Sequence, residues 1–168
     1  MRKMAIAVVL AAFVACPAVA ADAYVGLNLG SNKMGYSDVK ASSAYSLLFG
    51  YFFRQNIAAE VEYASFGSAE MTGSTNKVTG NAVSLSAIGF LPVNKTLSMF
   101  GKLGVATTKL EVIEASFLES KTYLAYGFGA QYNFGNSIGF RLGYDSFKVG
   151  STDTQNSNFT YLGALYKF

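Results

Sequence analysis

The chain has 168 residues and a formal net charge of +3, with 51% hydrophobic residues and only 14% charged residues. The length suits a single domain, and the charged fraction lies well below the roughly one quarter of a typical soluble domain. Beyond the N-terminus, no apolar run approaches the roughly 20 residues that a membrane-spanning helix requires, which argues against a helical membrane protein.

The first 20 residues, MRKMAIAVVLAAFVACPAVA, have the organisation of a secretory signal. Two basic residues precede an apolar run over residues 5–15, and the small residues Ala18 and Ala20 mark a cleavage site. We therefore predict a signal peptide over residues 1–20 that directs export through the Sec pathway and is cleaved after Ala20. Residues 21–168 would then form the mature domain.

Two alternatives for this segment stay open. The apolar run could be retained as an anchor, or Cys16 could be the acylated residue of a lipoprotein signal, although Phe13 and Pro17 fit that pattern poorly. Cleavage would remove the only cysteine, so no disulfide is expected. It would also leave 11 of the 13 basic residues beside 10 acidic ones, a balance that does not indicate nucleic-acid binding.

The mature chain contains eight segments in which apolar and small residues alternate with period two, as they do in β-strands. Each is about ten residues long, which is enough for a tilted strand to cross a bilayer. In chain order the segments are AYVGLNLGS (23–31), AYSLLFGYFF (44–53), IAAEVEYASF (57–66), NAVSLSAIGFL (81–91), LSMFGKLGVAT (97–107), TYLAYGFGAQYNF (122–134), SIGFRLGYDSF (137–147) and NFTYLGALYKF (158–168).

The connections between these segments alternate in length. Short ones such as residues 54–56, 92–96 and 135–136 would lie at one end of the molecule, and longer polar ones at the other. The pattern predicts an all-β fold, an eight-stranded antiparallel up-and-down transmembrane β-barrel in the outer membrane, with both termini on the periplasmic side. The long connections are expected at residues 31–43, 67–80, 109–120 and 150–157.

A soluble barrel with its apolar face turned inward is the alternative architecture. Its outer face would meet water and should be rich in Lys and Glu. Here the face opposite the large apolar residues consists mostly of Gly, Ala, Ser and Asn, which suits the crowded interior of an eight-stranded barrel. The large apolar face is then the one that contacts lipid.

The segment GYFFRQNIAAEVEYASFG, residues 50–67, resembles the hairpin between the second and third strands in the outer membrane protein A transmembrane-domain family. FGKLGVA (100–106) resembles the fifth strand of that family, and IGFRLGY (138–144) its seventh. The resemblance implies a barrel but no particular ligand. Family members with a peptidoglycan-binding domain continue well past the barrel, so with the last residue at Phe168 that activity is not expected here.

The last strand ends on an aromatic residue, with apolar residues at every second position before it. This ending resembles the signal that the outer-membrane assembly machinery reads, so that machinery and periplasmic chaperones are expected partners. The residues of this predicted assembly signal are Leu162, Ala164, Tyr166 and Phe168.

A few ionisable side chains fall on the inward face, and burial requires them to be paired. We predict that Glu60 and Glu62 pair with Arg141 and Lys102. Charges at membrane depth suggest function, so the cluster either fills the barrel as a structural plug or gates a narrow pore. Asp145 and Lys167 are the remaining inward charges.

The family resemblance implies a Glu–Arg–Lys–Glu cluster in the barrel core. Glu60 and Arg141 match its positions, and Lys102 falls where a basic residue is expected. Gln131 stands where a second Glu would be, and Ile88 falls near the position of a Lys. A gate in which one Lys changes carboxylate partners would therefore need Glu62 as a substitute acceptor.

No catalytic, metal or cofactor site is predicted. The chain contains no histidine, the usual base of outer-membrane barrel enzymes, and Glu111, Glu114 and Glu119 are expected to be solvated in or near a loop. Aromatic residues should form a belt at each membrane interface. The periplasmic belt would contain Tyr51, Phe53, Tyr132, Phe134, Tyr166 and Phe168, and the outer belt Tyr45, Tyr63, Phe66, Tyr123 and Tyr144.

The long polar connections remain as candidates for recognition, because binding segments are often loops on a rigid scaffold. The favoured prediction is a structural or adhesion-type role carried by these loops, and the alternative is a narrow, low-conductance pore. The expected partners are membrane lipid, a surface ligand, and lipopolysaccharide contacted through Lys33, Lys40 and Lys77.

Overall fold

The structure is a computed structural model that describes residues 22–34, 42–70, 77–112, 115–148 and 156–168. The predicted signal peptide, with Ala18 and Ala20, lies outside the described residues. No helix among the residues described is long and apolar enough to cross a membrane.

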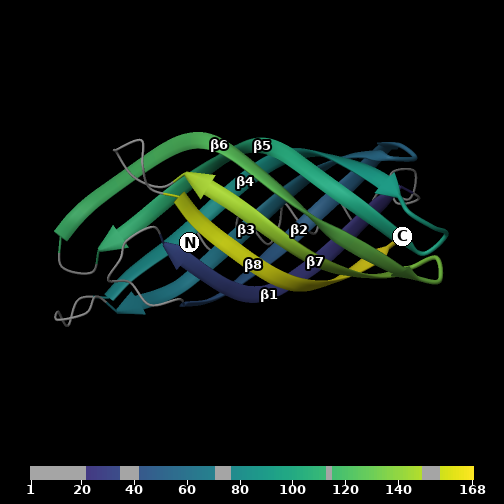
Figure 1. The fold of residues 1–168 in the computed structure, drawn as a ribbon. Coiled ribbons are helices and arrows are strands. Elements are labelled where there is room, and N and C mark those ends of the chain that lie inside the picture. The colour runs from purple at the N-terminus through teal and green to yellow at the C-terminus, as the bar shows by residue number, and fades with distance from the viewer. Residues whose placement is uncertain (1–21, 35–41, 71–76, 113–114, 149–155) are drawn as a thin grey trace.

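The described residues form eight strands that close into one antiparallel barrel, in which each strand pairs with its neighbours in sequence and β8 pairs with β1 (Figure 1). The predicted up-and-down barrel is therefore confirmed. Closure matters because it leaves no unpaired strand edge around the wall in contact with lipid. The strands are β1 (Ala23–Met34), β2 (Ser42–Arg54), β3 (Ile57–Glu70), β4 (Lys77–Pro92), β5 (Leu97–Val112), β6 (Ala115–Phe134), β7 (Ile138–Lys148) and β8 (Asn156–Lys167).

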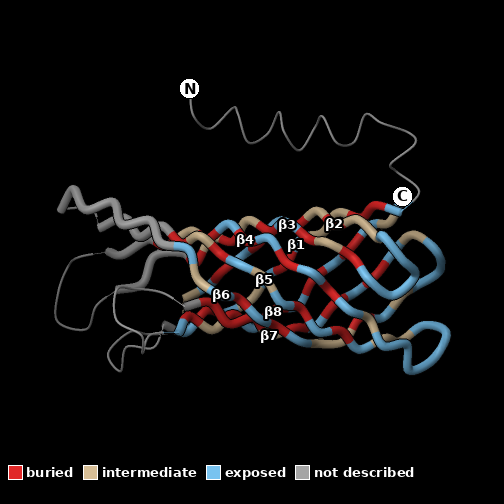
Figure 2. Tube along the Cα trace, turned by 90° about the horizontal axis from the view of Figure 1, so that it is seen from above, coloured by how far each residue is buried: buried red, intermediate tan, exposed pale blue. Residues whose placement is uncertain are grey.

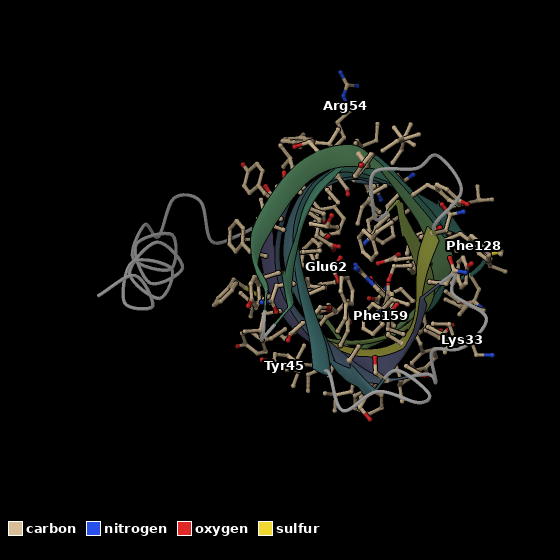
Figure 3. The ribbon with its side chains drawn as sticks, turned by 90° about the vertical axis from the view of Figure 1, so that its left-hand side faces the viewer. Lys33, Tyr45, Arg54, Glu62, Phe128 and Phe159 are labelled. Carbon is tan, nitrogen blue, oxygen red and sulfur yellow. The ribbon has the colours of Figure 1, made fainter. Side chains whose placement is uncertain are left out.

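Buried and exposed residues alternate along the strands, which gives the striped tube of Figure 2. In β8, Tyr161 and Leu165 are buried whereas Leu162 between them is 62% exposed. The view along the barrel shows the same division, with polar and aromatic side chains inside and large apolar ones outside (Figure 3). Glu62 and Phe159 lie within the ring, and Tyr45 and Phe128 lie outside it. Large apolar side chains that point outward are what a lipid environment requires.

The strands are longer than predicted. β6 has 20 residues and β5 has 16, against an expected length of about ten. Most of the loop expected at residues 109–120 is therefore strand, with Val112 of β5 opposite Ala115 of β6. The sequence misses this because alternation marks only the lipid-facing span, whereas backbone pairing continues wherever two strands lie side by side.

The other expected loops are also shorter than predicted, because the strands beside them are longer. β1 continues to Met34 and β2 begins at Ser42, so only residues 35–41 of the predicted 31–43 connection lie outside the described residues. β3 and β4 pair as far as Glu70 and Lys77, which leaves residues 71–76 outside them. Of the predicted 150–157 connection, residues 150–155 lie outside the described residues and β8 takes the rest.

The short connections lie together at the end of the barrel that also holds the C-terminus (Figure 1). In the β4–β5 turn, the Asn94 side chain accepts hydrogen bonds from the backbone N–H groups of Thr96 and Leu97, at 2.9 and 2.7 Å. In the β6–β7 turn, Gly135 has a φ of 68°, a conformation that glycine adopts without strain. These compact turns hold the strands in register at this end.

Candidate functional site

The inward charges come from four strands, and a glycine lies opposite several of them in register. Gly127 of β6 faces Lys102 of β5 on one side and Asp145 of β7 on the other. A Cβ atom at Gly127 would collide with the Asp145 carboxylate. The absence of a side chain at this position therefore lets the ammonium and the carboxylate meet across β6.

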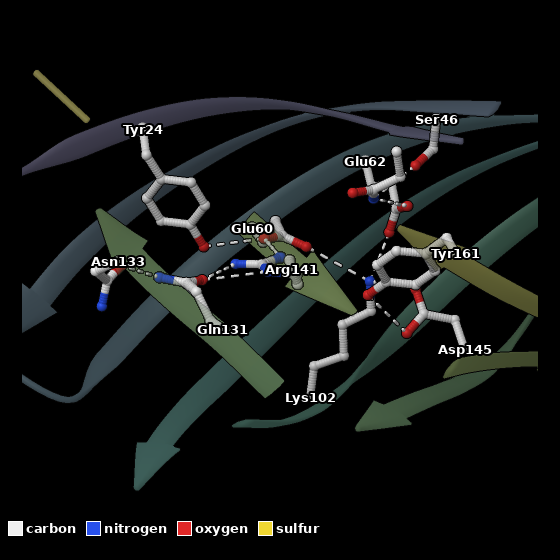
Figure 4. A network of polar contacts seen from close by, with 11 residues as sticks. Tyr24, Ser46, Glu60, Glu62, Lys102, Gln131, Asn133, Arg141, Asp145 and Tyr161 are labelled. Carbon is white, nitrogen blue, oxygen red and sulfur yellow. Dashed lines mark hydrogen bonds and ion pairs between the residues drawn. The ribbon is translucent and has the colours of Figure 1, made fainter. Parts of the chain in front are cut away.

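Two cations and three carboxylates form the centre of the interior (Figure 4). Arg141 Nη1 lies 2.7 Å from Glu60 Oε2. Lys102 Nζ lies 2.5 Å from Glu62 Oε2, 2.6 Å from Asp145 Oδ2 and 3.5 Å from Glu60 Oε1. All five side chains have at most 2% of their surface exposed. We call Glu60, Glu62, Lys102, Arg141 and Asp145 the charge cluster.

The structure thus brings together the residues that the sequence singled out. Glu60 contacts Arg141 and Glu62 contacts Lys102, as expected, and Asp145 is a third carboxylate around Lys102. With every group ionised, the cluster carries one more negative than positive charge. Each cation is buried beside a carboxylate, which offsets the cost of taking it out of water.

Gln131 and Asn133 extend the cluster towards the end with the short turns. The Gln131 carbonyl oxygen accepts hydrogen bonds from Arg141 Nε at 3.3 Å and Nη2 at 3.0 Å, and its amide donates to Asn133 at 2.9 Å. Lys167 lies apart from the cluster and donates to the same Asn133 oxygen at 2.8 Å. Where the family pattern has a second Glu, this chain holds its arginine with an uncharged amide.

The sequence analysis missed two tyrosines that complete the cluster. The Tyr24 hydroxyl donates to Glu60 at 2.9 Å, and Tyr161 donates to Asp145 at 3.5 Å. Their rings fit because Gly50 and Gly143 leave space, since a Cβ at either glycine would meet the ring. The signal available in the sequence for these contacts was a pair of inward tyrosines, each with a glycine on a neighbouring strand.

Asn28 and Phe100 also contact the cluster without having been predicted to do so. The Asn28 amide donates to Ser46 at 2.9 Å and to Glu62 at 3.4 Å. The Arg141 guanidinium lies 4.8 Å from the centre of the Phe100 ring, a distance suited to a cation–π contact. The arginine is therefore held by a carboxylate, an amide and an aromatic face together.

Aromatic rings pack together inside the barrel on both sides of the charge cluster. Towards the short turns, the rings of Tyr24, Phe52, Phe90 and Phe100 form a chain with centroid distances of 5.3, 5.4 and 6.2 Å. On the opposite side, Phe159 stacks on Tyr161 at 5.0 Å and Phe66 lies 5.8 Å from Phe147. The polar centre is therefore enclosed between two largely apolar layers.

One predicted aromatic position is wrong. Phe66 was expected in the outer lipid-facing belt, but it is 2% exposed and packs inside the barrel. It lies an even number of residues from Glu60 and Glu62, so the alternation of β3 turns it inward with them. Other predicted belt members do face outward, including Tyr45, Phe53, Tyr132, Phe134, Tyr166 and Phe168, which are 43–65% exposed.

The predicted assembly signal occupies the outward face of β8. Leu162 and Tyr166 are exposed, the Tyr166 and Phe168 rings lie 5.3 Å apart, and Phe168 N–H donates to the Ala23 carbonyl at 3.0 Å. Ala164 is exposed between them. The chain end is thus bonded to β1, the strand with which β8 closes the barrel.

The remaining candidates that the structure describes lie towards the other end of the barrel. Lys33 is exposed on β1 and Lys77 begins β4, while Lys40 lies outside the described residues. Glu111 and Glu119 belong to β5 and β6, and Glu114 lies outside the described residues. Within the described part of the chain, no group of three or more His, Cys, Asp or Glu side chains is placed to hold a metal ion.

Known proteins share this barrel fold. A family model described as "Outer membrane protein beta-barrel domain" matches residues 5–168. No curated protein matches the chain.

Among solved structures, the attachment invasion locus protein Ail of Yersinia pestis, in complex with the heparin analogue sucrose octasulfate, is 24% identical, with a TM-score of 0.63 over 88% of this chain and 97% of Ail. Neisserial surface protein A is 16% identical, with a TM-score of 0.68 over 87% of this chain and 97% of the neighbour. The N-terminal β-barrel domain of Pseudomonas aeruginosa OprF is 17% identical, with a TM-score of 0.61 over 86% and 97%. At these identities the likeness shows the fold.

Proposed function

The chain belongs to the outer membrane protein β-barrel family, and we propose that it is a small outer-membrane scaffold whose closed barrel holds surface-binding segments at its outer end. Its interior serves to fix the barrel rather than to transport a solute. Recognition is assigned to the end opposite the short turns, which in barrels of this kind faces outward.

The closed interior is the observation that carries this proposal. Five ionisable side chains that are almost fully buried lie between two aromatic layers. An aqueous channel would leave such charges hydrated, whereas here they are bound to one another. A barrel filled in this way is rigid, and a rigid support lowers the entropy cost of binding by the segments it presents.

One structural neighbour supports an adhesion-type role. Ail is named as an attachment invasion locus protein and was crystallised with a heparin analogue. We extend this to a ligand of the cell surface, either a host polyanion or lipopolysaccharide, contacted through Lys33, Lys40 and Lys77. Basic side chains would attract either ligand, because both are anionic.

Whole-cell binding tests the proposal directly. Residues 35–41 and 71–76, which lie between the strands, would be replaced, separately and together, by Gly/Ser segments of equal length, with Lys33→Gln and Lys77→Gln added, and binding of the bacteria to host cells and to heparin would be measured. We expect binding to fall while the barrel stays folded. A matched replacement of residues 55 and 56, in the β2–β3 turn at the opposite end, should have no effect. Unchanged binding in the first set would remove these segments from the proposal.

A narrow gated pore is the second candidate function, and one observation favours it. Lys102 lies within 3.5 Å of carboxylate oxygens from Glu62, Asp145 and Glu60, so it can change its main partner over a short distance. Planar-bilayer recordings of the chain, of Glu62→Gln and of Arg141→Ala would test this. Discrete openings that change with either substitution support the pore, and silence from folded protein rejects it.

We propose in addition that residues 1–20 are a Sec signal cleaved after Ala20, and that Leu162, Ala164, Tyr166 and Phe168 form the assembly signal read by the barrel-assembly machinery and its chaperones. N-terminal sequencing of the protein from outer membranes tests the first point. Deletion of Phe168, followed by quantification of folded barrel in the membrane, tests the second. The interpretation as a non-enzyme without cofactor stays a prediction.

A further inference from the structure

Strand β6 continues well past the end of β7 at the end of the barrel opposite the short turns (Figure 1). The ladder between the two strands stops at Ala125, which lies opposite Phe147, whereas β6 extends to Ala115. Among the described residues, none pairs with this side of β6 between Ala115 and Thr122. The other side pairs with β5, which in turn pairs with β4 as far as Val112. The β5–β6 hairpin therefore presents an open strand edge above the barrel wall, and neither proposed function uses it.

An open edge is a template for another strand, because its backbone N–H and C=O groups are available for pairing. Charged residues on such an edge usually keep a second copy away, since like charges on two identical strands repel. This edge carries one charge of each sign, Glu119 and Lys121. Opposite charges two positions apart match a strand with the reverse order, and β6 itself has that order when it runs antiparallel. The edge is therefore complementary to a second copy of itself.

One antiparallel register satisfies both charges. With Ser120 opposite Ser120 of the second copy, Glu119 of each copy lies opposite Lys121 of the other, and directly opposed unlike charges stabilise a strand pair. A shift of two residues is the smallest that keeps the same faces together, and in either direction it places Glu119 or Lys121 opposite itself. In the matched register, Ala115 of the second copy lies beside Ala125, where β7 begins to pair. The register that matches the charges is thus also the one that fills the edge.

Strand direction decides where the second copy lies. β6 runs from the outer end towards the short turns, so two copies in one membrane point the same way. A two-fold axis along the membrane normal would then bring Glu119 level with Glu119, and Lys121 level with Lys121. Copies in two facing membranes point in opposite directions, as antiparallel pairing requires. At about 3.3 Å per residue and a strand tilt of about 40°, their two Ala125 residues would lie about 25 Å apart along the barrel axis.

We propose that this edge of β6 is a self-recognition site, through which a copy in one outer membrane binds a copy in a facing membrane by antiparallel strand addition centred on Ser120. The contact is isologous, so one strand supplies both halves of the interface. The inference rests on the proposed function only for the outward orientation of this end of the barrel; the segment and the partner are different. Its consequence is adhesion between cells that carry the same protein, and the narrow gap restricts it to cells with short surface glycans.

Charge reversal tests the register. The purified chain would be refolded into phosphatidylcholine vesicles, and vesicle clustering would be followed by light scattering after each variant has migrated as a folded barrel in an unheated gel. Glu119→Lys and Lys121→Glu should each slow clustering by roughly 10- to 30-fold, because like charges then face each other twice. A mixture of vesicles that carry the two variants should cluster at the unmodified rate, because every charge again faces its opposite.

A matched pair of variants controls for attraction between oppositely charged vesicles. Glu111→Lys and Lys109→Glu make the same charge changes with the same spacing on β5, one strand away from the open edge. Each should cluster within about twofold of the unmodified chain, and mixing them should bring no gain. If the control mixture gains as much as the mixture of edge variants, the attraction is diffuse and the proposed register is wrong.

Disulfide formation tests the centre of the pairing. Directly opposed residues have Cβ atoms about 5 Å apart, close enough for a disulfide after a small adjustment. Ser120→Cys should therefore give covalent dimers between clustered vesicles under mild oxidation. Leu118→Cys should not, because it lies opposite Thr122 and about 13 Å from its own copy; the control shares any contribution from Cys16. Equal dimer yields from the two variants would overturn the register centred on Ser120.

Labelling of Ser120→Cys with a membrane-impermeant maleimide separates this inference from the proposed function. We expect labelling on vesicles and on intact cells, and sedimentation of cells with truncated lipopolysaccharide only when they express the unmodified chain or a mixture of the two edge variants. Labelling without clustering would overturn self-recognition and leave the proposed function in place. Absence of labelling on intact cells would overturn both, because this end of the barrel would not face outward.

Discussion

The inner and outer faces of the barrel wall differ in how narrowly they specify their residues. On the inner face, a Cβ atom added at Gly127 would collide with Asp145, whereas at Gly101 on the outer face it would meet nothing within 4 Å. The inner face is close-packed against itself, so each position demands one size and polarity. The outer face packs against lipid, which rearranges around whatever apolar side chain is present. The residues of the inner face are therefore specific to this protein, whereas the outer face requires only that its residues be apolar.

Breaking the charge cluster should produce the largest effect. Arg141→Ala leaves Glu60 buried without its closest cation, a change that costs about 3–5 kcal/mol in other proteins. The free energy of unfolding would be measured by urea titration in detergent micelles with far-UV circular dichroism, since the chain has no tryptophan. As a control, Arg54→Ala removes an exposed arginine and should cost less than about 1 kcal/mol. Similar losses for both arginines would contradict a buried, paired Arg141.

Two adjacent leucines of β2 give the next largest contrast. Leu48 is 2% exposed inside the barrel and Leu47 is 45% exposed towards lipid. Leu48→Ala should cost about 2–5 kcal/mol, because the cavity it leaves is closed. Leu47→Ala should cost less than half as much, because lipid or detergent fills the space. The same urea titration measures both, and equal losses would mean that the two faces do not differ in packing.

These contrasts also show what the sequence could predict. Alternation placed Leu47 on the outward face of the segment 44–53, and the requirement that buried charges be paired allowed Glu60 and Glu62 to be matched with Arg141 and Lys102. The sequence contains no sign of the contact between Asp145 and Lys102, because that contact depends on the register that places Gly127 between them. Nor could it find where β5 and β6 end, since above the lipid boundary backbone pairing continues without apolar alternation.

Two glycines, one on each face of the wall, test the same difference through the addition of a single methyl group. Gly127→Ala should cost about 1–3 kcal/mol, because overpacking must displace the Asp145 carboxylate from Lys102. Gly101→Ala, on the outer face, should be neutral or stabilising by about 0.4–1 kcal/mol, since it restricts the unfolded chain without a clash. Unfolding midpoints in the same detergent compare the two variants. A loss at Gly101 as large as that at Gly127 would show that lipid-side space is not free.

Removal of one hydroxyl is the smallest change that still separates the two faces. Tyr24→Phe keeps the ring against Phe52 but removes the hydrogen bond to Glu60. A hydrogen bond to a charged group contributes about 1.5–3 kcal/mol, and the lower end is expected here because Arg141 still holds the carboxylate. Tyr126→Phe, on the lipid face and 45% exposed, should change the free energy of unfolding by less than about 0.5 kcal/mol. If neither substitution changes the free energy of unfolding, Arg141 alone satisfies Glu60 and the Tyr24 ring serves only to fill space.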